Sequence, residues 1–284
     1  MSDIWKRKDK ELGMDYIETD PVPYLSFPIL EKTGLVTQGF STKMGGVSQG
    51  KFATLNFTFT RGDNPDHVME NYKRMGAALG VDEKRMVLSY QTHTTNVRLV
   101  TKEDAGKGIV KERDYTDVDG LITNVPGITL VTFYADCVPL YFLDPVHKAI
   151  GLSHSGWRGT VKRMGAVTAE KMKEVYKTKA EDLIACIGPS ICGDCYEVGE
   201  EVALEFKKAF AKKDWDKILR EKENGKFMLD LWKANEIILT EAGLRPENIQ
   251  ITDICTHCNS DYLFSHRTCG NDRGNLAAFL GLKE

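Results

Sequence analysis

The sequence predicts a single domain of α/β to α+β class, in which mixed β-sheets are flanked by helices. Short runs rich in β-branched and aromatic residues, typical of strands, recur along the chain and alternate with segments of helical periodicity. No repeat, linker or low-complexity tract divides the chain. A length of 284 residues is one at which a single large domain is common. We therefore predict one domain over 23–284, preceded by an N-terminal arm over 1–22.

The N-terminal half begins with this charged arm, which ends in a Pro-Val-Pro bend and is expected to be peripheral. Strand-like runs follow, with a glycine-rich surface loop after the second of them. A helix is predicted after Asp63 or Asn64, either of which can cap it, and it should end at Gly80. Its buried stripe comprises Val68, Tyr72, Met75, Ala78 and Leu79. Strands are predicted over 24–30, 35–41, 85–90, 96–101, 120–122 and 128–134.

The C-terminal half begins with residues 135–160, which predict strand, turn and strand around Asp144 and Pro145. The last part, from Ile251 on, contains two or three strands broken by a polar loop. Between them, helices are predicted over 161–176, 198–208 and 228–242, and a strand is predicted over 182–187.

Composition and charge exclude several classes of protein. Hydrophobic residues make up 42% of the chain and charged residues 28%, which argues against a disordered or fibrous protein. The net charge of −3 gives no broad basic field, so we expect no nucleic-acid polymer as partner, whereas a small phosphorylated or nucleoside ligand fits. No apolar run has the length of a signal-peptide core or a membrane span, so we predict a cytoplasmic protein without a membrane partner. Seven cysteines then indicate thiols, metal ligands or a reactive site rather than disulfides.

Residues 135–160 contain the most informative side chains of the sequence. Cys137 lies in the phrase ADC and His154 in HSGWRG, each at the end of a predicted strand. A thiolate and an imidazole that meet can act as a nucleophile with its base, or as two ligands of a soft metal. His93, in QTH between two earlier strands, is a third candidate. Two imidazoles and one thiolate would fill three positions of a tetrahedral zinc site and leave the fourth open, as in catalytic zinc sites.

Several phrases in a fixed order carry a resemblance to a known family: QTHTTNV, ADCVPLYFLDP, HSGWRGT, IGPSICGDCYEVG, and CTHCNSDYLFSHR with the downstream RGNLAAF. They resemble the laccase-domain family, first described as multicopper polyphenol oxidase-like and now understood as multi-activity purine nucleoside phosphorylases. The resemblance covers about residues 22–282. Carried over motif by motif, it implies zinc ligands at His93, Cys137 and His154.

The resemblance implies phosphorolysis of adenosine, inosine, guanosine and methylthioadenosine, and deamination of adenosine. Purine nucleosides and phosphate are therefore the expected partners, while the oligomeric state stays open. In deamination, Asp136 beside Cys137 is a candidate catalytic group for proton transfer at C6 of the purine. In phosphorolysis, phosphate attacks the ribose carbon and arginines must hold the dianion. The candidate groups for substrate, phosphate and catalysis are Asn56, Arg61, Arg158, Ser265 and Arg267.

Two other enzymatic interpretations stay open. Cys137 can act as a nucleophile with His154 as base, in a cysteine hydrolase or deamidase, and the family's architecture is similar to that of bacterial toxin deamidases with a Cys-His pair. A thiolate bound to zinc is a weaker nucleophile, so metal binding and cysteine catalysis compete. A copper-dependent polyphenol oxidase would need more histidines than the six present, although copper is the alternative metal for this donor set.

Two CxxC pairs provide a non-enzymatic interpretation. Cys192 with Cys195 forms one pair, and Cys255 with Cys258 forms the other. Four such thiols can make a structural zinc site or a thiol switch. The long separation between the pairs, and their place within the family phrases, favour ordinary thiols near the site instead.

Overall fold

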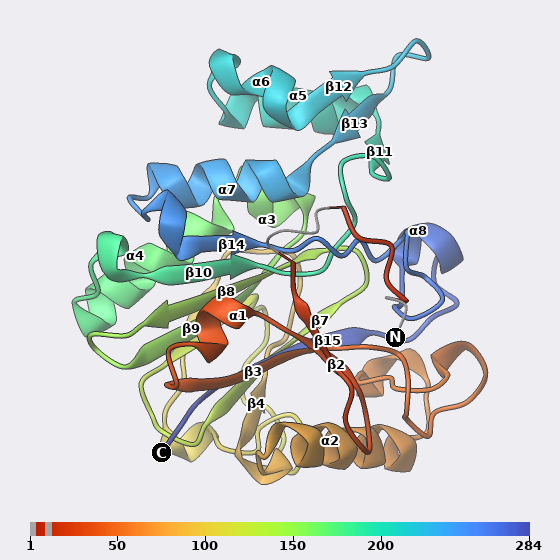
Figure 1. Ribbon diagram of the computed structural model, residues 1–284, viewed down its shortest axis with the longest axis vertical. Coiled ribbons are helices and arrows are strands. Elements are labelled where there is room, and N and C mark those ends of the chain that lie inside the picture. Colours follow the sequence, from red (N-terminus) through yellow and green to blue (C-terminus); the bar gives the residue numbers. More distant parts are fainter. Residues whose placement is uncertain (1–3, 9–12) are drawn as a thin grey trace.

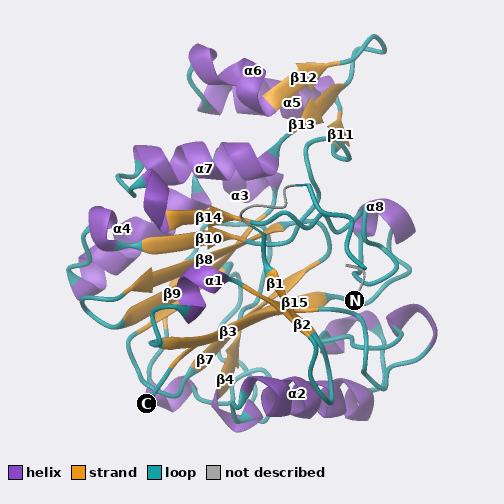
Figure 2. Ribbon diagram, in the orientation of Figure 1, coloured by secondary structure: helices purple, strands orange, loops and turns teal. Residues whose placement is uncertain are grey.

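Two six-stranded β-sheets lie face to face at the centre of the protein, and helices cover their outer faces (Figures 1 and 2). The computed structural model describes residues 4–8 and 13–284. Both sheets are mixed, because antiparallel neighbours are combined with parallel pairs at the edges. The chain passes from one sheet to the other more than once, so the sheets form one folding unit. The predicted fold class, a single domain of mixed sheets flanked by helices, is confirmed.

The first sheet joins strands from both ends of the chain. At its centre, β3 (Val36–Ser41) pairs with β15 (Leu276–Leu282), and β15 pairs with β7 (Thr129–Tyr134). The order across the sheet is β1 (Asp15–Ile17), β2 (Tyr24–Ser26), β3, β15, β7 and β4 (Met86–Leu88). The edge pair of β4 and β7 is parallel. The last strand of the chain therefore inserts between strands from its first half.

The second sheet is built around the hairpin of β8 (Val138–Asp144) and β9 (Ala149–Ser155). All seven residues of each strand are buried, because the first sheet covers one face and helices cover the other. The strand, turn and strand predicted over 135–160 are confirmed. The order across the sheet is β14 (Ile249–Ile251), β10 (Ile184–Ile187), β8, β9, β6 (Gly120–Thr123) and β5 (Val97–Leu99). The pairs of β10 with β14 and of β5 with β6 are parallel.

The helices form the outer layers of the molecule. α2 (Pro65–Leu79) packs on the first sheet, while α4 (Met164–Tyr176) and α7 (Leu231–Glu241) pack on the second (Figure 1). A small third sheet lies beyond α7 in the order β11 (Glu197–Val198), β13 (Phe227–Leu229) and β12 (Leu219–Glu221). The remaining helices are α1 (Pro28–Glu31), α3 (Trp157–Val161), α5 (Glu200–Ala209), α6 (Trp215–Ile218) and α8 (His266–Cys269). None of the described helices has the length and hydropathy needed to cross a membrane.

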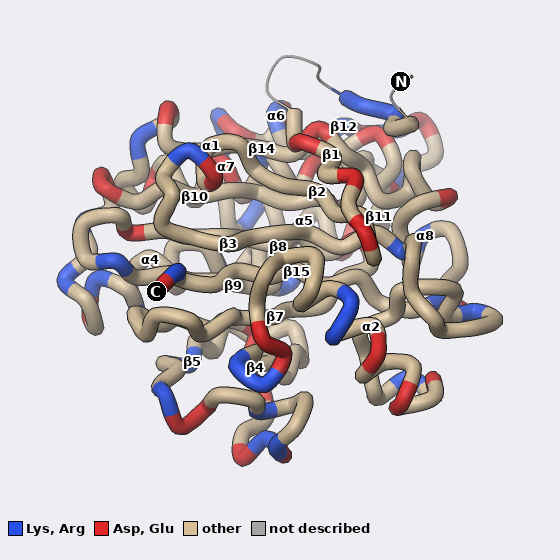
Figure 3. Tube along the Cα trace, turned by 60° about the horizontal axis from the view of Figure 1, so that its bottom comes forward, with Lys and Arg blue, Asp and Glu red and all other residues tan. Residues whose placement is uncertain are grey.

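Apolar side chains fill the space between these layers. The cluster between the two sheets includes Phe40, Tyr134, Tyr141 and Leu280. Other clusters lie between the second sheet and α4 and α7, and between the first sheet and α2. Figure 3 shows charged residues mainly around the edge of the molecule, whereas the central strands carry few of them. Burial of one large apolar side chain stabilises the folded state by about 1.5–3 kcal/mol, compared with leaving that side chain exposed.

Among the predicted elements, two differ clearly from the structure. The strand predicted over 24–30 ends at Ser26, because Pro28 begins α1, where a proline needs no amide hydrogen bond. The helix predicted over 228–242 is a strand followed by a helix. The Asp230 side chain accepts a hydrogen bond from the Lys233 N–H and so caps α7 at Leu231. By contrast, α2 has its predicted cap at Asn64 and its end at Gly80.

The N-terminal arm predicted over 1–22 is in contact with the domain wherever it is described. β1 pairs with β2 at the edge of the first sheet, and Trp5 is 5% exposed within the central core. Arg7 Nη1 lies 2.6 Å from Asp253 Oδ2, and the same carboxylate accepts the Met14 N–H at 3.0 Å. These contacts are those of an integral part of the fold rather than of a peripheral arm. Residues 1–3 and 9–12 of the predicted arm lie outside the described residues.

Candidate metal centre and substrate cavity

The three predicted metal ligands meet where the chain crosses between the two sheets. Cys137 lies in the crossing from β7 to β8, and His93 lies in the crossing from β4 to β5. His154 is in β9, opposite Pro139 of β8. The Sγ of Cys137 and one ring nitrogen of each histidine lie within 4.8 Å of one another. The two imidazole rings meet edge to face with their centroids 4.9 Å apart.

The buried carboxylate of Asp119 orients His154. Nδ1 of His154 lies 2.7 Å from Oδ1 of Asp119, just before β6. A carboxylate only accepts hydrogen bonds, so Nδ1 carries the proton and the lone pair of Nε2 is left for a metal. Carboxylate partners of this kind fix the ring orientation of ligating histidines and raise their basicity.

Asp119 also holds the loop that carries His93. Its carboxylate accepts the backbone N–H groups of Thr92, His93 and Thr94 at 2.9, 3.1 and 3.0 Å. His93 adopts a positive φ of 66°, a conformation that costs on the order of 1–3 kcal/mol for residues other than glycine. Hydrogen bonds to a charged acceptor offset this cost at about 1.5–3 kcal/mol each. One carboxylate therefore positions both histidines.

The three side chains shift each other's pKa values. Burial alone would raise the pKa of Cys137, but the charge and hydrogen bond of His154, together with a hydrogen bond from His93, lower it to about 6. Burial would lower the pKa of His154, yet the neighbouring Cys137 and Asp119 raise it to about 9. Each group therefore favours the charged form of the other, a thiolate beside an imidazolium. A thiolate is the form of cysteine that ligates metals and acts as a nucleophile.

A glycine leaves room for the ligand group. A Cβ on Gly156 would lie 3.0 Å from Cys137 Sγ and 3.1 Å from His93 Cδ2. Two imidazoles and one thiolate fit three positions of a tetrahedral metal and leave one position open. This donor set suits both zinc and copper. The group is therefore a metal-binding candidate with an open site.

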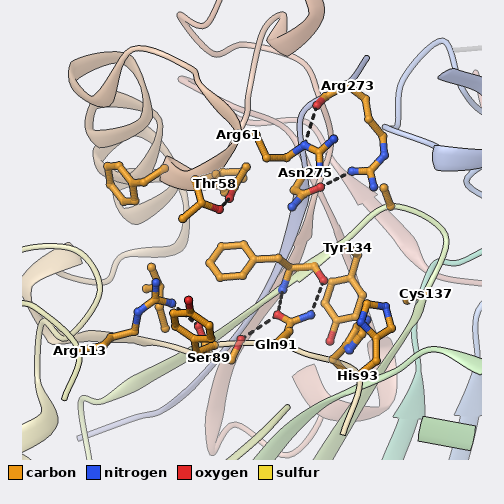
Figure 4. Close-up of a pocket in the computed structure, with 18 residues that line it drawn as sticks. Thr58, Arg61, Ser89, Gln91, His93, Arg113, Tyr134, Cys137, Arg273 and Asn275 are labelled. Atoms are coloured by element: carbon orange, nitrogen blue, oxygen red, sulfur yellow. Dashed lines mark hydrogen bonds between the residues drawn. The ribbon is translucent and has the colours of Figure 1, made fainter. Parts of the chain in front are cut away.

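The three ligands line a cavity of about 420 Å³ that also has apolar and cationic walls. Figure 4 shows Arg61, Arg273 and Asn275 on one side of this cavity, with His93, Tyr134 and Cys137 on another. Partly exposed Phe59 and Phe133 contribute aromatic rings. The complete lining comprises Phe57, Thr58, Phe59, Thr60, Arg61, Leu88, Ser89, Tyr90, Gln91, His93, Arg113, Phe133, Tyr134, Ala135, Cys137, His154, Arg273 and Asn275. Its size is typical of small-molecule sites.

Two arginines make part of this cavity suited to an anion. Burial and the nearby charge of Arg61 lower the pKa of Arg273 to about 10. Nη1 of Arg273 donates to Asn275 Oδ1 and to the Gly274 carbonyl, whereas its buried Nε has no hydrogen-bond acceptor among the described residues. Arg61 donates to the carbonyls of Asn271 and Arg273 at 2.8 and 3.3 Å. A phosphate bound here would neutralise the charge of both guanidinium groups.

Asp136, predicted as a proton-transfer group, does not line the cavity. Its Oδ1 accepts from Thr256 Oγ1 at 2.6 Å, and its Oδ2 accepts from Ser265 Oγ and the Arg267 N–H at 3.1 and 2.6 Å. Asp136 also adopts a positive φ of 86°. These hydrogen bonds connect the residue before Cys137 to the loop that follows β14.

The other predicted site residues are divided between the cavity and its surroundings. Arg61 lines the cavity, whereas Asn56 is fully buried and hydrogen-bonds Thr58 O, Asp63 Oδ2 and the Asn275 N–H. Ser265 caps α8. Arg267 donates to the Glu197 carbonyl at 2.8 Å, and exposed Arg158 stacks 4.3 Å from the Trp157 ring. The structure thus places Arg61 in the lining of the cavity that the ligand group also lines, and the other four residues outside that lining.

Sequence reasoning missed two important residues, Asp119 and Arg273. Asp119 lies in a DVDG segment with several acidic neighbours, so no local signal separates it from a surface aspartate. Arg273 does have a signal, since it begins the RGNLAAF phrase. That phrase becomes β15, and its arginine precedes the buried strand at the cavity.

The comparison with known families agrees with this arrangement. A family described as multi-copper polyphenol oxidoreductase laccase matches residues 37–283. The chain belongs to this family. The matched region contains all three members of the ligand group and both arginines of the cavity. The family description refers to copper, whereas relatives within the family carry other names.

Relatives within this family support the same assignment. Purine nucleoside phosphorylase YlmD of Bacillus subtilis (strain 168) is 35% identical over 253 residues, which cover 88% of this chain and 89% of that protein. Adenosine deaminase RL5, from an unknown prokaryotic organism, is 34% identical over 239 residues, or 84% of this chain and 90% of that protein. The crystal structure of Bacillus licheniformis hypothetical protein YfiH has a TM-score of 0.88 at 31% identity and covers 94% of this chain and 99% of that one. The family fold therefore extends over nearly the whole chain.

Proposed function

We propose that this chain is a zinc-dependent purine nucleoside phosphorylase that cleaves adenosine, inosine, guanosine and methylthioadenosine and also deaminates adenosine. The observation that carries the proposal is a single cavity that joins the group of His93, Cys137 and His154 to the paired arginines Arg61 and Arg273. The names of two family relatives, purine nucleoside phosphorylase and adenosine deaminase, support the two reactions. A cytoplasmic location stays a prediction.

The cavity provides separate regions for the parts of a nucleoside and its phosphate co-substrate. Aromatic side chains such as Phe59 and Phe133 can pack on the purine. Arg61 and Arg273 can hold the phosphate dianion beside the ribose. In phosphorolysis a phosphate oxygen bonds to C1′ while the C1′–N9 bond breaks, and the purine leaves with a proton. The arginines orient the nucleophile and stabilise its charge.

Deamination depends directly on the ligand group at the other side of the cavity, and phosphorolysis depends on it as well, because one cavity holds the substrate for both reactions. A zinc ion held by His93, Cys137 and His154 would supply Lewis-acid chemistry there. Asp119 keeps the Nδ1 proton of His154 in place and so fixes the direction of Nε2. We assign Asp136 to positioning Cys137 rather than to proton transfer, because the loop of Thr256 and Arg267 occupies its carboxylate oxygens.

The proposal is tested by incubating metal-quantified protein with adenosine and with inosine, with and without phosphate. Chromatography of the free bases and of ribose 1-phosphate measures phosphorolysis, and ammonia release measures deamination. We expect His93→Ala to lower both activities and Arg273→Ala to raise KM for phosphate with little effect on deamination. Arg245→Ala, at an exposed arginine outside the cavity, is the matched control. Unchanged turnover in His93→Ala would refute the zinc mechanism.

A cysteine hydrolase is a second candidate, since the lowered pKa of Cys137 and the chain from Cys137 through His154 to Asp119 resemble a nucleophile, base and orienting acid. Chelation and alkylation separate the two candidates. Activity that survives removal of metal but is lost with iodoacetamide would favour the hydrolase. Loss of activity on chelation, with recovery when zinc is restored, would favour the zinc enzyme.

Polyphenol oxidation is less well supported by the ligands. Electron transfer to oxygen in multicopper oxidases uses several histidine-ligated copper ions. In the part of the chain that the structure describes, only one close donor group contains histidine. Metal analysis together with an assay under anaerobic conditions tests this activity directly.

A further inference from the structure

Four cysteines outside the cavity converge on a second cluster. Sγ atoms of Cys192, Cys195, Cys255 and Cys258 all lie within 4.8 Å of one another. We propose that these four thiolates bind one Zn²⁺ as a closed structural site. None of the four residues lines the substrate cavity, so the proposal stands independently of nucleoside turnover.

Parallel pairing of two strands brings the CxxC segments together. β10 and β14 are neighbours in register, with Ile187 opposite Ile251. Each strand leads into one CxxC segment, and the pairing continues beyond the strands as a parallel bridge between Ser190 and Cys255. The Thr256 N–H donates to the Ser190 carbonyl at 3.1 Å. The sheet therefore brings together Cys195 and Cys258, which are 63 residues apart along the chain. The sequence analysis favoured ordinary thiols because it could not predict this strand pairing.

The sulfur positions suit a tetrahedral metal. With Zn–S bonds of about 2.3 Å, the sulfurs of a tetrahedral zinc site lie about 3.8 Å apart. Cys195 Sγ and Cys258 Sγ are 3.4 Å apart, and the other pairs fall within the 4.8 Å limit. A disulfide would need about 2.05 Å, and all four cysteines are free. Small movements of the side chains therefore suffice to bind zinc.

Two backbone N–H groups and one ammonium group lie near the sulfurs. Backbone N–H groups of Cys192 and Cys258 point to Cys255 Sγ at 3.3 and 3.5 Å. The turn after Cys192 is closed by hydrogen bonds from the Cys195 and Tyr196 N–H groups to its carbonyl at 2.9 and 3.1 Å. Lys8 lines the same surface hollow as Cys192 and pairs with Asp194 at 3.1 Å. A zinc ion with four thiolates carries a net charge of −2, which a nearby ammonium group offsets.

The cluster is connected to the candidate catalytic site through Asp136. Ile191, just before Cys192, donates its N–H to the Asp136 carbonyl at 3.1 Å. Thr256, just after Cys255, donates to the Asp136 carboxylate at 2.6 Å. A metal that ties the two CxxC segments together therefore also fixes the backbone that carries Cys137. Structural zinc of this kind contributes directly to folding free energy.

Metal content of purified variants tests the proposal. We expect the wild-type protein to bind two zinc ions per chain when prepared with zinc and reductant. His93→Ala/His154→Ala should retain one zinc ion, whereas Cys195→Ser/Cys258→Ser should lose one. Cys269→Ser, which changes an exposed cysteine outside both clusters, is the matched control and should retain two. Elemental analysis identifies the metal.

X-ray absorption on His93→Ala/His154→Ala provides a test that does not require the cysteine variant to fold. We expect a shell of four sulfurs at about 2.3 Å around zinc, and a lower unfolding temperature after chelation. Four free thiols without bound metal would overturn the proposal, and so would iron in place of zinc. Disulfides in a preparation without bound zinc would indicate a thiol switch instead. Because these measurements use no nucleoside, they stay informative whether or not the proposed enzymatic activity is found.

Discussion

The two cysteine-containing clusters of this protein use the same chemistry of thiolates in different surroundings. His93, Cys137 and His154 offer three donors at a cavity of about 420 Å³, and His93 is exposed to it. The four cysteines that follow β10 and β14 offer four donors. Three donors leave a metal position open for chemistry, whereas four donors close it. We therefore predict that substitutions in the first cluster lower turnover, while substitutions in the second lower stability.

The largest expected effect separates these two roles. Cys137→Ala should lower turnover more than about 100-fold. Loss of a residue that only hydrogen-bonds to a metal ligand already lowers metal affinity or activity about 10–100-fold, and Cys137 is itself a candidate ligand. Cys255→Ala should lower the free energy of unfolding by about 4 kcal/mol or more, as for loss of a structural metal. Steady-state kinetics and urea unfolding measure the two quantities on both variants.

A matched variant checks the stability arm of this test. Cys186→Ala removes a fully buried thiol of β10 that belongs to neither cluster, and it should cost about 1 kcal/mol. If Cys255→Ala destabilised the protein no more than Cys186→Ala, the cluster of four cysteines, here called the closed cluster, would have no structural role. If Cys137→Ala retained wild-type turnover, the group of His93, Cys137 and His154, here called the open cluster, would not be the catalytic centre.

The second prediction concerns the outer partner of the open cluster. The Asp119 carboxylate orients His154 and accepts hydrogen bonds from three backbone N–H groups. Asp119→Asn preserves the size of this side chain but removes its negative charge. We expect metal affinity or turnover to fall about 10–100-fold. Competition with a zinc chelator and steady-state kinetics measure the two effects. An unchanged affinity together with unchanged turnover would show that the carboxylate has no positioning role.

Local sequence signals predicted much of the fold. Asn64, Pro65 and Gly80 fix the ends of α2, and the β-branched runs that form β7, β8 and β9 match their predicted positions closely. The third sheet was not predicted, because β13 is too short to show a period and lies directly before a strong helix. Its Phe227 and Leu229 are buried in a cluster shared with α5 and α7, so long-range packing decides its conformation.

The candidate site was predictable only in part for the same physical reason. The family phrases identified His93, Cys137 and His154, and the fold brings these residues together. The role of Asp119 depends on β6 pairing with β9, and that of the second CxxC pair depends on β14 pairing with β10. Such pairings are properties of the sheet and leave no local mark in the chain. The polar residues Asn56, Ser265 and Arg267 were predicted to bind substrate. In the structure their polar groups form hydrogen bonds with other residues of the protein.

The third prediction uses a matched pair of glycines beside the open cluster. Gly156→Ala would place a Cβ 3.0 Å from Cys137 Sγ and 3.1 Å from His93 Cδ2, so the ligands must move apart. Gly159→Ala is the control, because the nearest atom to its Cβ lies at an ordinary 3.5 Å. Overpacking of this kind costs about 1–3 kcal/mol, so we expect metal affinity to fall about 10-fold in Gly156→Ala alone. Equal affinities in the two variants would mean that the ligand group tolerates displacement.

The smallest expected effect lies at the periphery of the closed cluster. Lys8 and its partner Asp194 are 34% and 64% exposed at their side chains, so solvent screens the charge that Lys8 offers to the thiolates. Lys8→Met preserves most of the side-chain volume and should lower the free energy of unfolding by less than about 1 kcal/mol, as for other exposed ion pairs. Urea unfolding at low and high salt measures this effect, which should shrink as salt is added. A loss as large as that in Cys255→Ala would mean that charge balance, rather than the four sulfur donors, determines the stability of the closed cluster.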